Sequence, residues 1–485
     1  MNYLSLSFYA FFILFFLIYY IIPQRYRYIV IFLGSWLFYG YSDPKILSVL
    51  LAVTIVTYLG GLIIKARPGK STLCCFFLIN ICILLVFKYS NFMIQNYNSI
   101  VSRLLPRAPM ASEIDILLPI GLSFIIFQSC TYLTDIYHKN IEPERNIIRY
   151  GAFVAFFPTI LSGPIQKSRE LIPQIKCPRE FDGEAAKKGT LLFIWGLFEK
   201  TMVANNLSTI VNRVFNDYLS FNSAYYIIAA VCFSLYIYAD FSSYSDMARG
   251  IAQIMGIDIK KNFNNPYLST TTSEFWNRWH MSLNSWFVEN IYIPLGGNRK
   301  GTLRKYFNVA VVFFVSGIWH GANWHFVAWG VVNGVLVIIG QALKPVKKYI
   351  CTKLKIDENV ESILLCRRAI VFWLISVTWV FFRNGVRESL YIVKRIIMFS
   401  PLNFFDPGLL AISGTNTATF ISIIAAVLFC VMQLKRQNEH EVYLKYSRQP
   451  LVVQCICAAI VICICVFAIC STEPDVNTQF LYFQF

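Results

Sequence analysis

Charged side chains are scarce in this chain of 485 residues: Asp, Glu, Lys and Arg make up 14% of it, while hydrophobic residues make up 56%. A soluble globular protein carries about a quarter charged residues, and a disordered chain carries fewer apolar ones than this. The scarcity of charge therefore excludes a soluble enzyme, a coiled coil and a disordered protein. The composition indicates an integral membrane protein with many spans.

Several motifs of soluble enzymes are also missing. The chain contains no HExxH or CxxC motif and no zinc-like ligand spacing, so we expect no metal site. It contains neither a GxSxG nucleophile motif nor a Walker-type GxxxxGK[ST] loop, which argues against hydrolases and NTPases. The formal net charge is +17. In so apolar a chain we assign the excess Lys and Arg to cytoplasmic loops, and we predict no nucleic-acid partner.

Apolar segments suited to crossing a bilayer recur along the chain and predict an all-α polytopic membrane protein with about 12 spans. The expected spans are 3–22, 28–42, 46–64, 73–93, 116–136, 189–206, 223–240, 306–320, 324–343, 368–384, 410–434 and 451–470. Segment 150–166 is broken by Pro158, Gly163 and Pro164, so we expect a re-entrant loop enclosed by protein. The first span lacks a basic leader and a cleavage site, so we expect it to be retained.

Basic clusters alternate with these segments, which places them in the cytoplasm and both termini outside the cell. We predict one transmembrane domain over 1–471 and an extracellular tail over 472–485. The polar stretch 241–305 interleaves aromatic and basic residues, which is typical of helices that lie in the membrane interface.

Histidine is rare, with 5 residues in the chain: His138, His280, His320, His325 and His440. An ionisable group within a span is costly, so its default interpretation is functional. His320 ends the apolar run 306–320, while His280 lies in EFWNRWHMSLNSWF, where Trp276, His280 and Phe287 are expected to share one helix face. The alternative for both is a hydrogen-bonded structural histidine, and His325 fits an interfacial anchor.

Two carboxylates, Asp240 and Asp246, lie in YIYADFSSYSDMA at the expected end of span 223–240. Helix capping and hydrogen bonding account for such residues more readily than catalysis does.

Four blocks of the sequence resemble the signature blocks of the membrane-bound O-acyltransferase family. They are FFPTILSGPIQ (156–166), YADFSSYSDMARG (238–250), FWNRWHMSLNSWFVENIYIPLGGNRKG (275–301) and SGIWHGANWHFVAWG (316–330). They occur in the family's order, define a core over about 155–330, and are most similar to the bacterial branch that contains the alginate O-acetylation membrane protein and the teichoic-acid D-alanyltransferase. The resemblance implies a bacterial plasma-membrane protein whose helices and interfacial segments surround a central funnel. It implies that His320 is catalytic and that His280 is the second polar residue of the site.

The last residues, FLYFQF, resemble the tail of the small single-span protein that accompanies the D-alanyltransferase. That resemblance implies a transient acyl group on Tyr482. We expect substrate contacts from residues around the histidines and in the tail: Trp276, Asn323, Trp324, Asp240, Phe480, Phe483 and Phe485. An aromatic tail that merely lies in the interface is the alternative.

The predicted activity is transfer of an acyl group, most simply acetyl, from a cytoplasmic thioester toward an extracellular polysaccharide. The donor is acetyl-CoA or an acidic acyl carrier protein, no cofactor stays bound, and a second, serine-esterase-like acyltransferase is the expected partner beside the lipid bilayer. D-alanyl transfer to teichoic acid is the alternative within the class. A transporter or flippase of lipid-linked glycans is the alternative of another class, but inverted repeats typical of transporters are not visible.

Overall fold

The computed structural model describes residues 1–105, 108–435, 439–471 and 479–481, and these residues form helices joined by turns and loops, with no strand among them. They fall into two compact units. Unit 1 comprises residues 1–193 and 247–260, and unit 2 comprises residues 194–246 and 261–485. Two helices, α9 (Gly183–Phe198) and α11 (Ser223–Ile254), contribute residues to both units.

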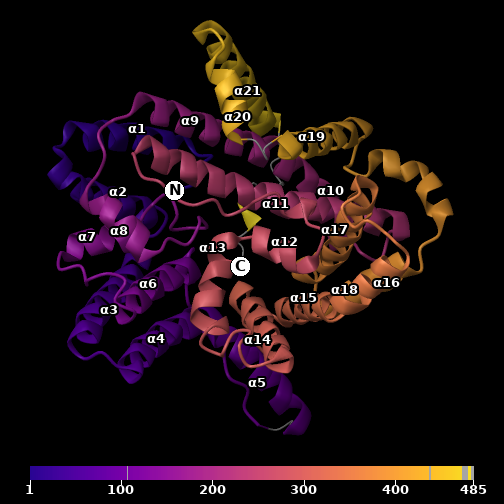
Figure 1. Cartoon of the computed structure of the whole chain (residues 1–485), viewed down its shortest axis with the longest axis horizontal. Helices are drawn as coiled ribbons and strands as arrows, with labels where there is room; N and C mark the ends of the chain where they lie inside the picture. Colours follow the sequence, from indigo (N-terminus) through magenta and orange to yellow (C-terminus); the bar gives the residue numbers. More distant parts are fainter. Residues whose placement is uncertain (106–107, 436–438, 472–478, 482–485) are drawn as a thin grey trace. The chain divides into compact units, whose positions relative to one another are not determined.

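Unit 1 is built mainly from apolar helices of the first third of the chain. Its helices are α1 (Leu6–Ile21), α2 (Arg27–Gly40), α3 (Ile46–Ala66), α4 (Lys70–Leu84), α5 (Ser90–Leu104), α6 (Leu122–Tyr137), α7 (Ile147–Val154) and α8 (Ser168–Lys176). Helix α3 packs against α4 and α6, and α2 packs against α7 (Figure 1). A π-helical turn, Leu85–Tyr89, joins α4 to α5, so that the two form one long apolar rod.

The broken segment 150–166 belongs to unit 1, and each of its residues is buried. Side chains from other parts of unit 1 bind its backbone: Ser35 accepts from the Phe157 amide at 3.1 Å, and Tyr3 donates to the Pro158 carbonyl at 2.7 Å. Gln128 donates to the Phe153 carbonyl at 2.6 Å. Irregular backbone away from water requires such enclosure by protein, and the segment has it; its re-entrant course stays a prediction.

Unit 2 holds the helices that follow. Apart from its parts of α9 and α11, these are α10 (Asn205–Asn216), α12 (Thr272–Arg278), α13 (Met281–Phe287), α14 (Thr302–His320), α15 (Trp324–Ala342), α16 (Lys344–Lys353), α17 (Glu361–Arg383), α18 (Val386–Ile397), α19 (Asn416–Lys435), α20 (Glu439–Ser447) and α21 (Leu451–Ser471). Helices α14 and α15 form an antiparallel hairpin, and α15 packs against α17 on its other side (Figure 1).

In the part of the chain that the structure describes, six helices are long and apolar enough to cross a membrane. They are α3, the α4–α5 rod, α11, α15, α17 and α19, and α1 and α21 are shorter apolar helices. The remaining expected spans correspond to α2, α6, α9 and α14, which are shorter or carry more charge. The prediction of an all-helical protein with many membrane-crossing helices is therefore confirmed at this coarser level.

Two expectations about the central polar stretch were wrong. Helix α11 does not end at residue 240 but continues to Ile254, so Asp240 and Asp246 lie in its interior and cap nothing. Trp276, His280 and Phe287 do not share one helix, because α12 ends at Arg278 and α13 begins at Met281. His280 between them has a left-handed backbone with φ of 43°, which interrupts the expected periodicity.

Candidate active site

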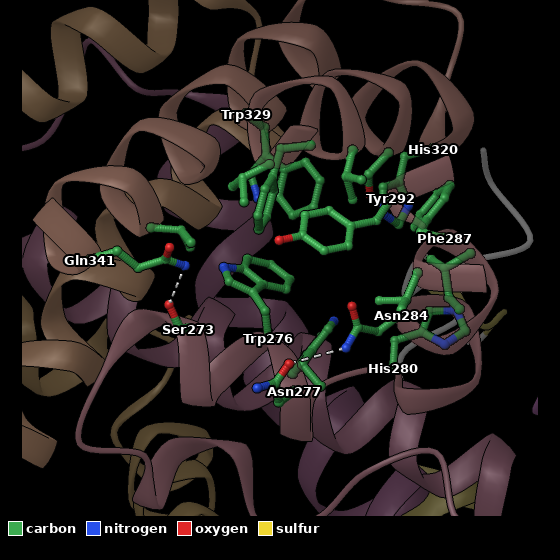
Figure 2. A pocket seen from close by; sticks show the side chains of 18 of the residues that line it. Ser273, Trp276, Asn277, His280, Asn284, Phe287, Tyr292, His320, Trp329 and Gln341 are labelled. Atoms are coloured by element: carbon green, nitrogen blue, oxygen red, sulfur yellow. Dashed lines mark hydrogen bonds between the residues drawn. The ribbon is translucent and has the colours of Figure 1, made fainter. Parts of the chain in front are cut away.

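A cavity of about 270 Å³ lies within unit 2, between α12, α13, α14 and α15. Its walls are mostly aromatic and aliphatic, with a few polar groups, which is the usual composition of a small-molecule site. Figure 2 shows both predicted histidines, His280 and His320, at this cavity together with Trp276, Tyr292 and Trp329. The structure therefore brings together the two histidines, although 40 residues of sequence separate their positions.

His320 is the last residue of α14 and is buried. Its ring lies between three aromatic side chains, with centroid distances of 4.9 Å to Trp319, 5.0 Å to Trp329 and 5.1 Å to Phe382. Each of these rings meets the imidazole edge to face, at interplanar angles of 72° to 90°. This enclosure fixes the plane of the imidazole and keeps bulk water away from it.

The tautomer of His280 follows from its contact with Asn262. Its Nδ1 lies 3.0 Å from Asn262 Oδ1, and the same oxygen accepts the backbone N–H of Ser282 at 3.2 Å. Because a backbone N–H can only donate, the Asn262 atom at this point is the amide oxygen. His280 Nδ1 therefore carries the proton, and Nε2 is the nitrogen with the lone pair.

Burial keeps His280 neutral: it lowers the pKa of this histidine from 6.5 to about 3. The loss of hydration penalises the imidazolium, while a hydrogen bond from the ring to its own backbone opposes the shift. A left-handed backbone at a residue other than glycine costs about 1–3 kcal/mol and is frequent at functional sites. His280 combines a strained backbone, a fixed tautomer and a neutral ring at the cavity wall.

Tryptophan side chains form much of the cavity wall and its surroundings. The ring of Trp276 meets that of Trp329 at 5.5 Å, and Trp329 stacks on Trp379 at 5.6 Å. The indole N–H groups of Trp276 and Trp329 are buried and have no hydrogen-bond partner among the described residues. Two buried donors without acceptors are costly unless a ligand oxygen satisfies them.

The position of His320 depends on close packing of α14 against α15. A Cβ atom at Gly317 would lie 2.5 Å from the carbonyl oxygen of Phe326, and a Cβ at Gly330 would clash with the carbonyl oxygen of Phe313. Only glycine, which has no Cβ atom, lets the two backbones approach this closely at these positions, as in other helix pairs of membrane proteins.

We expect Gly317→Val to push α14 away from α15 and to withdraw His320 from Trp329. Overpacking of this kind costs about 1–3 kcal/mol, so the melting temperature and the activity of the detergent-purified protein should fall together. Gly340→Ala on α15 is the control, because the nearest neighbour of a Cβ at this position, the Thr272 hydroxyl, lies 3.3 Å away. Equal melting temperatures and activities for the two variants would show that this crossing does not position His320.

Asp240 lies elsewhere in unit 2 and forms a buried ion pair that the sequence did not indicate. Its Oδ1 lies 2.6 Å from Nζ of Lys200, and both side chains are 1% exposed. Lys200 belongs to a π-helical segment, Glu199–Ala204, that joins α9 to α10. Its neighbour Glu199 is buried too and accepts hydrogen bonds from Ser242 at 2.8 Å and Gln433 at 2.9 Å.

The other residues predicted to contact substrate are dispersed. Phe480 is buried in unit 2, whereas Tyr482, Phe483 and Phe485 lie outside the described residues. Trp276 lines the cavity. Asn323 caps α15 by accepting the His325 amide at 3.3 Å, and Trp324 is 57% exposed. Neither Asn323 nor Trp324 is among the described residues that line the cavity.

Three residues escaped the sequence analysis: Trp329 in the cavity wall, Asn262 beside His280, and Lys200 in the buried ion pair. Asn262 is one of several asparagines in a loop, and Lys200 follows Glu199 in a segment that reads as the end of a span. A lysine within an apolar run is a signal of function in a membrane protein, so Lys200 could have been singled out. Asn262 carries no such signal, because its role depends on a contact across 18 positions of the chain.

Comparison with known proteins places these features in context. Residues 114–383 match the model of the membrane-bound O-acyltransferase family, and this range contains every residue of the cavity wall. A probable alginate O-acetylase AlgI of Azotobacter vinelandii is 32% identical over 418 residues, which cover 85% of this chain and 79% of that protein. The peptidoglycan O-acetyltransferase of Helicobacter pylori is 29% identical over 396 residues, covering 75% and 72% of the two chains. The teichoic acid D-alanyltransferase of Bacillus subtilis is 27% identical over 231 residues, covering 45% and 58%.

Proposed function

This chain belongs to the membrane-bound O-acyltransferase family, and on that premise we propose that it moves an acetyl group from a thioester donor in the cytoplasm toward a polysaccharide outside the cell. The observation that carries the proposal is the cavity that both His280 and His320 line, walled in part by tryptophans and lying within the family-matched region. The similarity to alginate and peptidoglycan O-acetylating proteins supports acetyl as the group and a polysaccharide as the final acceptor.

In the proposed reaction His320 is the general base. Its imidazole takes the proton of the acceptor hydroxyl while the hydroxyl oxygen attacks the thioester carbonyl carbon. The C–S bond then breaks, and the thiol leaves with the proton that His320 returns. The buried indole N–H groups of Trp276 and Trp329 are placed to donate hydrogen bonds to the carbonyl oxygen as it gains charge.

We propose that the first acceptor is the hydroxyl of Tyr482. A phenol has a pKa of about 10, so it loses its proton more readily than an aliphatic alcohol, and its ester releases the acyl group easily. A serine on an extracellular, serine-esterase-like acyltransferase would then take the acyl group, which leaves Tyr482 free for another cycle.

One turn of α11 supports this relay, because it contacts both the tail and His280. Asp240 accepts the Leu481 amide at 2.7 Å, and the Phe241 ring lies 4.7 Å from that of His280. Residues four apart share a helix face, so Asp240 and Tyr244 face the tail while Phe241 and Ser245 face the loop of His280 and Asn262.

The donor is acetyl-CoA or an acidic acyl carrier protein, which the net charge of +17 would attract. The enzyme lies in a bacterial plasma membrane with about 12 spans around a funnel, segment 150–166 re-entrant, and the tail outside.

The proposal is tested with the purified protein in liposomes and thioester donors labelled in the acyl group. We expect label from acetyl-CoA or acetylated carrier to appear on the C-terminal peptide, located by mass spectrometry at Tyr482. Label from a D-alanyl carrier protein alone would favour D-alanyl transfer instead. Passage of a lipid-linked glycan across the bilayer, with no covalent label on the protein, would favour the transporter.

Replacing Asn262 by aspartate tests the state of His280. A carboxylate beside Nδ1 favours the imidazolium and raises the pKa of His280, whereas burial holds it at about 3 in the natural protein. Protonation occupies Nε2, so the rate of Asn262→Asp should fall as the pH drops through the raised pKa and should approach the natural rate at alkaline pH. The measurement is the acyl-transfer rate from about pH 5 to 9. Superimposable profiles would show that neutral His280 is not needed.

A further inference from the structure

The proposed reaction does not use a deeply buried ion pair of unit 2. Lys200 Nζ and Asp240 Oδ1 are 2.6 Å apart, with both side chains 1% exposed. Transfer of two charges out of water is costly, and the attraction between them compensates only when further hydrogen bonds satisfy the remaining donors and acceptors. The partners that supply those bonds therefore show what the pair is for.

Those partners are main-chain groups of the last described residues. Lys200 donates to the carbonyl oxygen of Gln479 at 3.1 Å, and Asp240 Oδ2 accepts the N–H of Leu481 at 2.7 Å. The ammonium thus meets an acceptor and the carboxylate meets a donor of the same short segment. We call residues 479–481 the tail segment. Its backbone is held by two charge-assisted hydrogen bonds, which are stronger than neutral ones.

The side chain between these two groups is recognised as well. The Phe480 ring lies 4.8 Å from Lys200 Nζ, within range of a cation–π interaction, and meets the Tyr244 ring edge to face at 5.2 Å. Phe480 is 1% exposed and Leu481 is 3% exposed. The tail segment is therefore enclosed, with its backbone bound by charge and its aromatic side chain bound by Lys200 and Tyr244.

The segment that contains Lys200 has an unusual backbone conformation. Lys200 lies in the π-helical segment Glu199–Ala204, and such segments are frequent at functional sites. The neighbouring carboxylate of Glu199 is bound by Ser242 and Gln433, and Gln433 also accepts from the Tyr238 hydroxyl at 3.0 Å. Glu199 therefore has hydrogen-bond partners of its own on α11 and α19.

We propose that the Lys200–Asp240 pair is a receptor for the tail segment, which holds it in one register and thereby presents the next residue, Tyr482, for acylation. The catalytic meaning of this inference rests on the proposed function, whereas the docking rests on the contacts alone. Lys200 and Asp240 are positioning residues. They bind the carrier of the acyl group and touch none of the reacting atoms.

Exchanging the two charged residues distinguishes a pair that binds the tail segment from a pair that only stabilises unit 2. The double variant Lys200→Asp with Asp240→Lys keeps opposite charges together. It places a carboxylate beside the Gln479 carbonyl and an ammonium beside the Leu481 N–H, so both hydrogen bonds to the tail segment are lost. A pair that served only to stabilise unit 2 would tolerate the exchange.

The first measurement is amide hydrogen exchange at Leu481 in the full-length protein in detergent, resolved by fragmentation in the mass spectrometer. We expect exchange at least tenfold faster in the charge-exchanged variant than in the natural protein. Arg368→Glu with Glu361→Arg is the matched control, because it reverses another ion pair of unit 2, with a 2.7 Å separation on α17, and should leave Leu481 unchanged. Slow exchange that persists in a folded charge-exchanged variant would overturn the docking.

A second variant covers the case in which reversed charges prevent folding. Lys200→Met with Asp240→Leu replaces the pair by apolar side chains, a change that buried ion pairs often tolerate. It should also speed exchange at Leu481 at least tenfold.

The second measurement is the fraction of Tyr482 that carries an acyl group. It should fall at least tenfold in both variants of the Lys200–Asp240 pair and remain unchanged in the Arg368–Glu361 control. Normal acylation despite rapid exchange at Leu481 would overturn the positioning role. Acylation of Tyr482 that is absent even from the natural protein would refute the proposed relay, and the exchange data would then still decide the docking.

Discussion

Replacement of His320 by alanine is expected to lower acyl transfer by about 10²- to 10⁴-fold, the range that a general base contributes. The side chain is enclosed by Trp319, Trp329 and Phe382, so no other described histidine can take its position without rebuilding the aromatic wall. The measurement is the initial rate of label transfer from the acyl thioester to the protein and to the polysaccharide.

His138→Ala is the control for this prediction, because His138 is exposed in unit 1 and lies outside the cavity. It should retain the natural rate. A folded His320→Ala protein with an unchanged rate would remove His320 from the mechanism and leave His280 as the candidate base.

Replacement of Tyr482 by phenylalanine is expected to abolish the acyl adduct on the tail and to reduce acylation of the polymer by at least about a hundredfold, as loss of a covalent intermediate does. The change removes a single oxygen atom and keeps the ring, so the aromatic character of the tail is preserved. Mass spectrometry of the C-terminal peptide measures the adduct, and the labelled polymer measures the overall reaction.

Tyr349→Phe provides the comparison, since Tyr349 is 65% exposed on α16 and should not affect either readout. If Tyr482→Phe left polymer acylation intact, the tail would serve as an aromatic anchor, and the polymer or a carried intermediate would have to enter the cavity itself.

The two substitutions are expected to block different steps of the reaction. His320→Ala should block the first transfer, so no acyl group reaches the tail. Tyr482→Phe should leave the cavity and its base intact and block only the acceptor. A small substitute phenol in the assay is therefore expected to restore donor turnover to Tyr482→Phe but not to His320→Ala.

Much of this protein could be inferred from residue composition and local motifs. Whether a helix can cross a membrane depends on the summed hydrophobicity of its own side chains. The apolar runs therefore indicated the long helices α3, α11, α15, α17 and α19 without any knowledge of their neighbours. The blocks around His280 and His320 indicated the family, and both histidines lie at one cavity.

Local patterns failed where a long-range contact overrides them. Helix α11 continues to Ile254 past the polar residues that seemed to end it, because Lys200 and other buried partners satisfy those residues inside the protein. The helix around His280 breaks at Trp279 because Asn262 binds the chain on the far side of the break, through its side chain and through its carbonyl to the Met281 amide at 2.8 Å. Neither partner is near in sequence.

The sequence by itself determined that this is a helical membrane protein of the O-acyltransferase family, since hydrophobicity and signature blocks are properties of short stretches read one at a time. Only the tertiary structure decided which tautomer His280 adopts, which rings enclose His320, and that Lys200 and Asp240 hold the tail segment. Hydrogen bonds and ion pairs are set by distances of a few ångströms between residues that can be hundreds of positions apart, and only folding brings those residues together.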